Sequence, residues 1–224
     1  GFQPLRRSCY GRAMSRTILF DFWRSSASYR VRIALNLKGV AYETIPVSLP
    51  DDAQRNADYL ARNPQGLVPM LSIDGHDLTQ SLAIIDYLDA RFPQPLLIPA
   101  DPLLRARAMA AAYLIASDIH PLNNLRVLKY LKGTLGQEQA AIDDWYRHWV
   151  REGFTALEAL APDDGLFGSD YPDIADICLV PQMYNARRFE LPMEAYPKLV
   201  RIDEALRGMD AFAKAAPEAV KPGK

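Results

Sequence analysis

The spacing of hydrophobic positions changes along the chain and divides it into two parts. From residue 17 to about residue 92, strand-like and helix-like patterns alternate. Residues 17–23 are rich in β-branched and aromatic side chains, which predicts a buried strand. Residues 28–38 carry apolar side chains at i, i+3 and i+4 and are followed by Gly39, which predicts a helix with a glycine cap.

The remainder of this first part predicts three more strands and another long helix. Residues 42–48 have the composition of a strand. The pair Asp74-Gly75 is a hairpin turn signal between short strands at 70–73 and 77–80. Residues 81–91 have helical periodicity. The order β-α-β-(short α)-β-β-α predicts a mixed sheet covered by helices.

The second part of the chain predicts helices only. The segment between the two parts contains four prolines and lacks the backbone donors that a helix or strand needs, so it predicts an interdomain linker. Helical periodicity then covers residues 103–130, 137–160, 174–189 and 198–214, and strand signals are absent. We therefore expect an extension at residues 1–15, an α/β domain at 16–92, a linker at 93–102 and an all-helical domain at 103–224.

Charge and hydropathy exclude two classes of partner. The chain has 224 residues, of which 26 are Lys or Arg and 27 are Asp or Glu, so its net charge is −1. A nucleic-acid-binding surface usually shows as a basic excess, so no nucleic acid is expected as the main partner. The longest apolar stretch, residues 108–116, is far shorter than the ~20 residues that cross a bilayer, so no membrane span is expected.

The first residues and the two cysteines set the expected compartment. The opening segment is basic but lacks the apolar core of a secretory signal, so residues 1–15 are interpreted as a disordered extension, with Met14 as the native start. Cys9 and Cys178 cannot form a disulfide framework or a zinc site, so no metal is expected. Cys178 lies in an apolar run, where a buried, inert thiol is the usual interpretation. Together these features predict a protein of the cytoplasm.

Three short segments have side chains that can carry chemistry. The first is Arg24-Ser25-Ser26, between the first predicted strand and the first predicted helix. A serine at this place is commonly an N-cap, which is worth about 1 kcal/mol. The functional alternative is that a serine hydroxyl and the helix N-terminus together stabilise a thiolate.

The other two segments lie later in the α/β part. Val68-Pro69 precedes a strand and is either an ordinary turn proline or a cis proline. In the second case the N–H and C=O of Val68 are exposed to pair with an extended peptide. Gln80-Ser81 begins the next helix and is either a cap or a site that binds a carboxylate at the helix N-terminus.

Longer motifs identify a family. Residues 24–35, RSSASYRVRIAL, resemble the SSCSxRVRIAL signature of zeta-class glutathione transferases. Residues 63–69 and 80–85 resemble the glutathione-binding segments of that family. Residues 118–124, 179–182 and 185–189 are similar to segments of its bacterial maleylacetoacetate and maleylpyruvate isomerases. The resemblance runs in unbroken order from about residue 17 to residue 217.

The resemblance implies a fold, a cofactor and a reaction. The fold is an N-terminal thioredoxin-like domain followed by an all-helical C-terminal glutathione transferase domain, assembled as a homodimer. The cofactor is glutathione, and the reaction is the cis–trans isomerisation of maleylacetoacetate or maleylpyruvate in aromatic-compound and tyrosine catabolism. The two substrates differ by one methylene, and both stay open. The alternatives are a general glutathione transferase that conjugates electrophiles and a non-catalytic glutathione-binding protein of the same fold.

The resemblance also implies roles for individual residues. Ser25 is expected to activate the glutathione thiol, with Arg24 beside it as a second catalytic residue. The residues expected to bind glutathione are Ser25, Ser26, Gln65, Val68, Pro69, Gln80, Ser81, His120 and Asn124. Arg24, Arg126 and Arg188 are expected to bind the carboxylates of a small dicarboxylate substrate, because arginine binds carboxylates bidentately. The alternatives are helix-surface arginines at 126 and 188 and a structural histidine at 120.

Two positions refine this assignment. Ala27 stands where the family signature often has Cys, which argues against a cysteine-dependent thiol transferase more than against isomerisation. Asp173 and Asp176 resemble the N-capping box of the family, and we predict a structural role for both.

Overall fold

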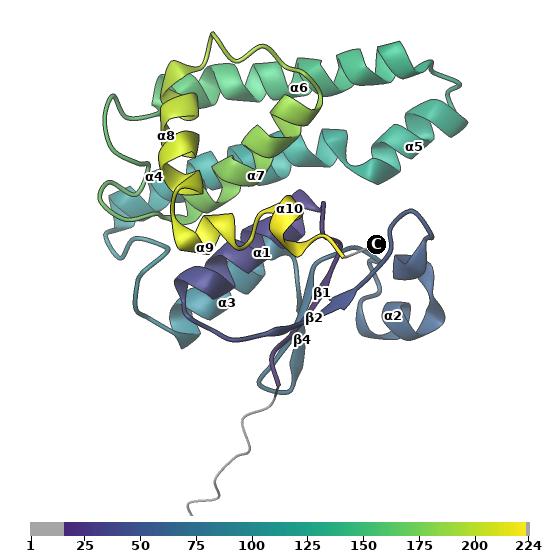
Figure 1. Cartoon of the computed structure of the whole chain (residues 1–224), viewed down its shortest axis with the longest axis horizontal. Helices are drawn as coiled ribbons and strands as arrows, with labels where there is room; N and C mark the ends of the chain where they lie inside the picture. The colour runs from purple at the N-terminus through teal and green to yellow at the C-terminus, as the bar shows by residue number, and fades with distance from the viewer. Residues whose placement is uncertain (1–15, 223–224) are drawn as a thin grey trace, which may run out of the picture.

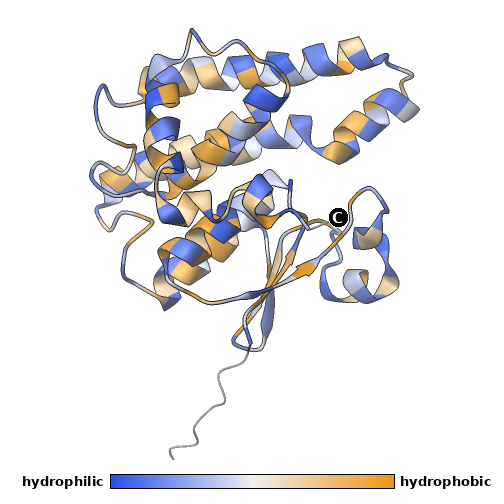
Figure 2. Ribbon diagram, viewed as in Figure 1, coloured by the Kyte–Doolittle hydropathy of each residue, from blue (hydrophilic) through white to orange (hydrophobic). Residues whose placement is uncertain are grey.

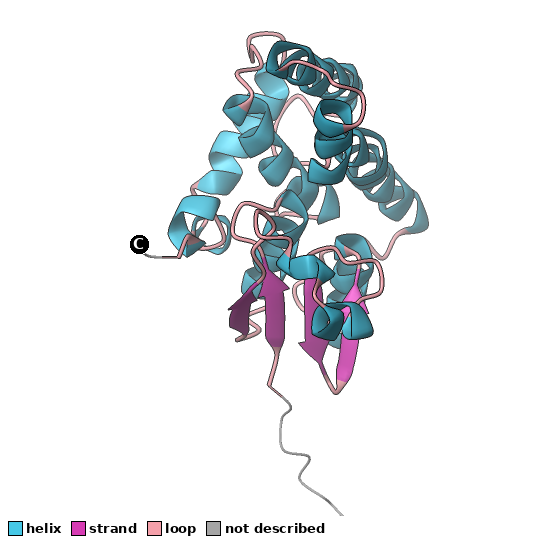
Figure 3. Ribbon diagram, turned by 90° about the vertical axis from the view of Figure 1, so that its right-hand side faces the viewer, coloured by secondary structure: helices cyan, strands magenta, loops and turns pink. Residues whose placement is uncertain are grey.

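The structure, a computed structural model, describes residues 16–222 of the chain. The N-terminal part contains a four-stranded sheet in the order β2-β1-β3-β4, with β2 parallel to β1 and the other neighbours antiparallel. In chain order its elements are β1 Ile18–Asp21, α1 Ser26–Leu37, β2 Glu43–Pro46, the 3₁₀ turn η1 Ala53–Arg55, α2 Ala57–Arg62, β3 Met70–Ile73, β4 His76–Thr79 and α3 Ser81–Arg91. This is the expected thioredoxin-like arrangement, and Figure 3 shows the four strands side by side below the helical part.

Helix α1 lies at the centre of the molecule because of its sequence. Ten of its twelve residues are buried, and a helix without a polar face is stable only when it is covered on all sides. Helices α3, α7 and α9 pack against it, as Figure 1 shows. The helix begins at Ser26, two residues before the predicted start, because Ser25 provides its N-cap.

The C-terminal part is helical, as the resemblance implies. Its elements are α4 Pro102–Tyr113, the π-helical turn η2 Leu114–Ile119, the 3₁₀ turn η3 His120–Asn123, α5 Leu125–Gly133, α6 Gln139–Leu160, α7 Ile174–Arg188, α8 Pro197–Arg207, α9 Asp210–Ala213 and α10 Pro217–Val220. Within residues 102–222 the one strand-like feature is an isolated bridge between Leu166 and Ser169. The predicted helix at 198–214 is divided between α8 and α9.

The predicted continuous helical segment at 103–130 is wrong, because the chain breaks between α4 and α5. Pro121 lacks a backbone N–H and therefore cannot donate the hydrogen bond of a continuing α-helix, and Asn124 has extended backbone angles, with φ −65° and ψ 145°. The side chain of Asn124 then accepts a hydrogen bond from the backbone N–H of Arg126 at 3.1 Å and caps α5. As a result, Arg126 lies in the first turn of a new helix instead of in the middle of a longer one.

The proline-rich segment between the two parts is packed against the rest of the molecule. The backbone N–H of Leu97, which is fully buried, donates to the Asp89 carboxylate at 2.7 Å. The buried ammonium of Lys38 also donates to Asp89, at 2.7 Å, and to the carbonyl of Phe92 at 2.7 Å. The segment ends one residue earlier than predicted, because Pro102 is the first residue of α4 and Asp101 caps that helix.

A single hydrophobic cluster joins the sheet part to the helical part. Buried residues of α1 and α3 belong to the same cluster as those of α4, α6, α7 and α8. In Figure 2 hydrophobic residues are dense where α1 and α3 lie below the other helices. None of the helices in residues 16–222 is both long and apolar enough to cross a membrane.

The start of α7 has the predicted capping box. The side chain of Asp173 accepts hydrogen bonds from the backbone N–H groups of Ala175 and Asp176, at 2.7 and 3.3 Å. The Asp176 carboxylate in turn accepts from the backbone N–H of Asp173 at 3.1 Å. The structural role predicted for both aspartates is therefore confirmed.

A buried ion pair ties the end of β1 to α1. Nη1 of Arg32 lies 2.8 Å from both carboxylate oxygens of Asp21. The same guanidinium donates to the carbonyls of Trp23 at 3.0 Å and Ala215 at 2.9 Å. The Arg32 and Asp21 side chains are 1% and 3% exposed. This pair fixes the backbone directly before Arg24, and it also anchors the C-terminal segment.

We predict that Asp21→Ala will destabilise the protein by about 3–5 kcal/mol, because it leaves the Arg32 guanidinium buried without a counter-charge. The free energy of unfolding in urea measures the effect. The control is Asp86→Ala, which removes the exposed partner of Arg105 at 3.2 Å and should cost about 0–1 kcal/mol. Equal losses in the two variants would contradict the prediction.

Candidate active site

Two contiguous cavities lie between the sheet part and the helical part. The first, of about 250 Å³, is bordered by the β1–α1 turn, α5 and α7, and we call it the arginine cavity after Arg24, Arg126 and Arg188. The second, of about 480 Å³, is bordered by α1, the Val68-Pro69 turn and the start of α3, and we call it the α3 cavity. The residues that border both cavities are Leu67, Val68, His120, Asn124 and Arg126.

The structure places every residue predicted for the site at one or both cavities. Arg24, Ser25, Ser26 and Arg188 border the arginine cavity alone. Gln65, Pro69, Gln80 and Ser81 border the α3 cavity alone. Val68, His120, Asn124 and Arg126 border both. The fold therefore brings together side chains that are up to 164 positions apart, from Arg24 to Arg188 (188 − 24).

The β1–α1 turn presents two serine hydroxyls to the arginine cavity. Oγ of Ser25 accepts a hydrogen bond from the backbone N–H of Ser28 at 3.3 Å, so the N-cap interpretation of Ser25 is correct. Capping uses only a lone pair of the hydroxyl, which leaves its hydrogen free to donate to an anion. The cap and the proposed catalytic role are therefore compatible in the same side chain.

The Val68-Pro69 peptide is cis, as predicted. The preceding carbonyl, of Leu67, accepts hydrogen bonds from the Tyr59 hydroxyl at 2.6 Å and the Asn63 amide at 2.7 Å, which fix the turn. Within residues 16–222 the backbone N–H and C=O of Val68 have no hydrogen-bond partner. Both groups are therefore free to pair with the backbone of an extended peptide.

The start of α3 has the properties of an anion site. Gln80 has a φ of 67° and its side chain caps nothing; it donates instead to the Gln65 amide oxygen at 2.7 Å. A non-glycine residue held at positive φ is strained, and such strain is concentrated at functional sites. The first N–H groups of α3 are left without a side-chain cap, and they carry the positive end of the helix dipole.

The arginine cavity is strongly cationic. Among residues 16–222, Arg24, Arg126 and Arg188 form no ion pair with a carboxylate. Arg24 lies over the Trp23 ring and Arg188 over the Phe189 ring, with 5.3 and 4.7 Å to the ring centroids. Aromatic contacts of this kind hold a guanidinium without neutralising its charge.

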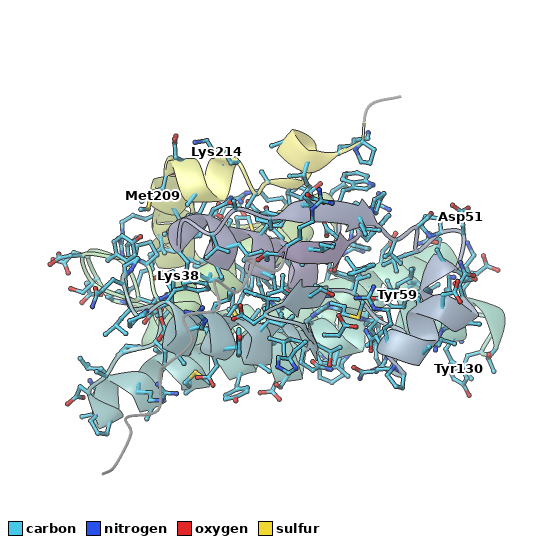
Figure 4. The ribbon with its side chains drawn as sticks, turned by 90° about the horizontal axis from the view of Figure 1, so that it is seen from below. Lys38, Asp51, Tyr59, Tyr130, Met209 and Lys214 are labelled. Atoms are coloured by element: carbon cyan, nitrogen blue, oxygen red, sulfur yellow. The ribbon has the colours of Figure 1, made fainter. Side chains whose placement is uncertain are left out.

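The sequence patterns missed two further cations of this cavity, Arg55 and Lys129. Lys129 on α5 pairs with Asp52, in the loop after β2, at 2.9 Å. In Figure 4, Asp51 of that loop and Tyr130 of α5 lie at the same end of the molecule. The ion pair therefore joins the sheet part to the helical part beside the arginine cavity.

Tyr146 is a further cavity residue that the sequence did not reveal. Its ring is buried and stacked on Phe189, with 3.5 Å between centroids and 7° between planes. Burial raises the pKa of Tyr146 to about 12, and the neighbouring Arg188 partly opposes that rise. The hydroxyl is therefore a neutral hydrogen-bond donor at physiological pH. No local pattern marks it, since Tyr146 occupies an ordinary buried position of the amphipathic helix α6.

The described residues supply no reactive thiol and no metal site. Ala27, at the family's Cys position, borders the α3 cavity. The one cysteine within residues 16–222, Cys178, is buried outside both cavities, and burial raises its pKa to about 11. No group of three or more His, Cys, Asp or Glu side chains in this range could hold a metal ion. Thiol chemistry at this site would therefore require a bound thiol.

Comparison with known proteins gives consistent matches over nearly the whole chain. The family model of the glutathione S-transferase N-terminal domain matches residues 19–96. Maleylacetoacetate isomerase of Rhizobium meliloti is 50% identical over 93% of this chain and 99% of its own length.

Solved structures give the same result at the level of the fold. A holo structure of maleylpyruvate isomerase, a bacterial zeta-class glutathione transferase, is 44% identical, with a TM-score of 0.90 over 92% of this chain and 100% of its own. A maleylacetoacetate isomerase from Methylobacterium extorquens, solved with bound malonate and glutathione, is 38% identical. Its TM-score is 0.88 over 92% of this chain and 98% of its own.

Proposed function

The chain belongs to the zeta-class glutathione transferase family that contains maleylacetoacetate isomerases, and we propose that it is a glutathione-dependent cis–trans isomerase of maleylacetoacetate or maleylpyruvate. The observation that carries the proposal is the pairing of the two cavities. The α3 cavity has groups for a small peptide, and the contiguous arginine cavity has three arginines without carboxylate partners among the described residues.

The residues of this chain that border the α3 cavity offer groups that match the backbone and the carboxylate of glutathione. Val68 offers an unpaired backbone N–H and C=O for the cysteinyl backbone of the tripeptide. The start of α3 at Ser81 offers backbone N–H groups for its γ-glutamyl carboxylate. Gln65, Gln80, His120 and Asn124 supply polar side chains along the same cavity.

When bound, glutathione supplies a thiolate that adds reversibly to the cis double bond, so that rotation can occur before the double bond forms again. The protein lowers the thiol pKa, and Ser25 is placed to donate a hydrogen bond at the N-terminus of α1. Arg24, Arg126 and Arg188 bind the substrate carboxylates. Negative charge that develops on the conjugated ketone is stabilised by the cationic surface, to which Arg24 contributes, and by the neutral Tyr146 hydroxyl.

Steady-state kinetics with both maleyl substrates, with and without glutathione, tests the proposal. We expect turnover of at least one substrate that depends on glutathione and does not consume it. Conjugation of an electrophile without isomerisation would favour a general transferase, and binding of glutathione without any turnover would favour a binding protein.

We predict that Ser25→Ala will lower turnover about 10- to 100-fold and change glutathione affinity much less, because the lost hydrogen bond is to the thiolate. The bound-thiol pKa should rise, as measured by titration of the thiolate absorbance. The control is Asp101→Ala, which removes the N-cap of α4 outside both cavities and should leave turnover unchanged. A bound-thiol pKa that does not change in Ser25→Ala would exclude this role.

We predict that Arg126→Met and Arg188→Met will each lower kcat/KM for the maleyl substrate, since methionine keeps part of the stem but removes the charge. The expected loss of transition-state stabilisation is roughly 2–4 kcal/mol. Conjugation of an uncharged aromatic electrophile should hardly change, so the ratio of the two activities is the measurement. Arg151→Met, on the exposed face of α6, is the matched control. A parallel fall in both activities would exclude a carboxylate-binding role.

We further propose a homodimer in which the sheet part of one protomer packs against the helical part of the other. Family membership and the large exposed apolar side chains Leu103, Leu104 and Tyr113 on α4 support it. We predict that analytical ultracentrifugation at micromolar concentration will give a species of twice the 25.1 kDa chain mass. A single species at the chain mass would refute the dimer.

We propose the cytoplasm as the location of the protein. The buried free thiol of Cys178 supports a reducing compartment. Fractionation of the source cells with an antibody to the protein would test this, and recovery outside the cytoplasmic fraction would contradict it.

A further inference from the structure

We propose that Arg30, His120 and Ser26 form a hydrogen-bond relay that directs the Ser26 hydroxyl toward the glutathione sulfur as a second donor beside Ser25. The inference rests on the proposed function for the identity of the anion. It assigns Arg30 and His120 as positioning residues, which act through Ser26 and not on the sulfur itself.

The relay begins at Arg30, a buried cation without a counter-charge. Its side chain on α1 is 1% exposed and borders the α3 cavity. Nη1 donates to Oγ of Ser81 at 3.3 Å, Nη2 contacts Nδ1 of His120 at 3.4 Å, and Nε has no partner. No carboxylate within residues 16–222 pairs with it. An unpaired buried cation is costly, so its retention indicates that it serves an anion or a directed hydrogen bond in the cavity.

Arg32, two residues further along the same helix, shows the contrast. Its guanidinium is equally buried but pairs with Asp21 and with two backbone carbonyls. Arg32 therefore has a complete set of acceptors that explains it structurally. Arg30 has a hydroxyl and an imidazole instead, and both belong to residues that border the α3 cavity.

The contact with Arg30 determines the tautomer of His120. A guanidinium has only donors, so Nδ1 of His120 must accept. The hydrogen of the neutral imidazole then lies on Nε2, which is 3.4 Å from Oγ of Ser26 and donates to it. The charged groups that face His120 are Arg30 from α1 and Arg126 from α5. Burial and these two cations lower the pKa of His120 to about 3, so the ring stays neutral.

The last step concerns the direction of the Ser26 hydroxyl. Ser26 is buried at the first turn of α1 and borders the arginine cavity next to Ser25. Because its oxygen accepts from His120, its own hydrogen is available for an acceptor in the cavity. Oγ of Ser25 is similarly engaged as an acceptor by the N–H of Ser28. Both hydroxyls therefore present their hydrogens at the positive end of α1, where a thiolate is stabilised.

The contacts of 3.3–3.4 Å are long for strong hydrogen bonds, and catalytic hydrogen bonds commonly shorten when the ligand is bound.

The relay also connects the two parts of the chain. His120 comes from the break between α4 and α5, whereas Arg30 and Ser26 come from α1. The Ser26 hydroxyl can therefore act as the second donor only when the helical part is packed correctly on α1.

The first experiment needs no substrate. Nitrogen NMR of the full-length protein reports the tautomer of His120, with His120→Gln used to assign its resonances. We expect the Nε2–H tautomer and a neutral ring from pH 5 to pH 8. The Nδ1–H tautomer, or a ring that gains a proton in this range, would overturn the relay whatever reaction the protein catalyses.

The second experiment measures the bound-thiol pKa and the pH profile of kcat/KM in four variants with glutathione. Ser26→Ala and His120→Leu should raise the bound-thiol pKa by about one unit and move the acid limb of the profile to higher pH. His120→Gln should restore most of the wild-type value, because its amide oxygen can accept from Arg30 and its amide nitrogen can donate to Ser26. His148→Leu, an exposed histidine of α6 outside both cavities, should change neither.

The outcomes separate the relay from the proposed function. Wild-type protein that binds no glutathione would refute both. Glutathione-dependent turnover with an unchanged thiol pKa in Ser26→Ala and His120→Leu would refute the relay alone. Equal effects of His120→Gln and His120→Leu would show that the imidazole fills space and does not transmit a hydrogen bond. Thermal unfolding of each variant shows whether a loss of activity follows from a loss of fold.

Discussion

The buried guanidinium of Arg32 is the interaction on which the geometry of the site depends. It holds the carboxylate at the end of β1, the carbonyl of Trp23 and the carbonyl of Ala215. The first two fix the backbone that leads into Arg24, Ser25 and Ser26, and the third attaches the C-terminal segment to α1. Figure 1 shows α9 beside α1 at this place. A charge pair that is so deeply buried tolerates little displacement, because any loosening would leave a charge unpaired in an apolar surrounding.

The helical part contributes to the site through an interruption, not through a regular helix. The α-helix α4 ends at Tyr113, a π-helical turn and the 3₁₀ turn η3 follow, and α5 then begins with its own cap at Asn124. π-helical turns are common at functional sites, since they change the direction of side chains while the segment stays helical. Here the redirection puts His120, Asn124 and Arg126 at the boundary of both cavities.

Charge is distributed unevenly between the surface and the site. The net charge of −1 conceals a cavity with Arg24, Arg55, Arg126, Lys129 and Arg188, in which Asp52 is the acidic residue and pairs with Lys129. A cleft lined by one sign of charge attracts ligands of the opposite sign and raises their local concentration. Such a site needs no basic excess over the whole chain, and for this reason overall composition excluded nucleic acid without revealing the anion site.

The sequence by itself determined the alternation of strands and helices, the helical character of the second part and the three glutathione-type segments, because these depend on local periodicity and on short motifs. Ser25, Val68-Pro69 and Gln80-Ser81 were found in this way, each at the end of an element where backbone groups are left unpaired. Only the tertiary structure showed that the neutral Tyr146 hydroxyl and the cations Arg55 and Lys129 border the arginine cavity. Helical periodicity alone also missed the interruption between α4 and α5, although Pro121 and the Asn124 cap are local features. The tertiary structure also decided the difference between Arg30 and Arg32, which are both buried on one helix, two residues apart, and look alike in the sequence. Local pattern specifies which side chains a helix buries, but the partner that each buried charge meets depends on which distant segments pack against it.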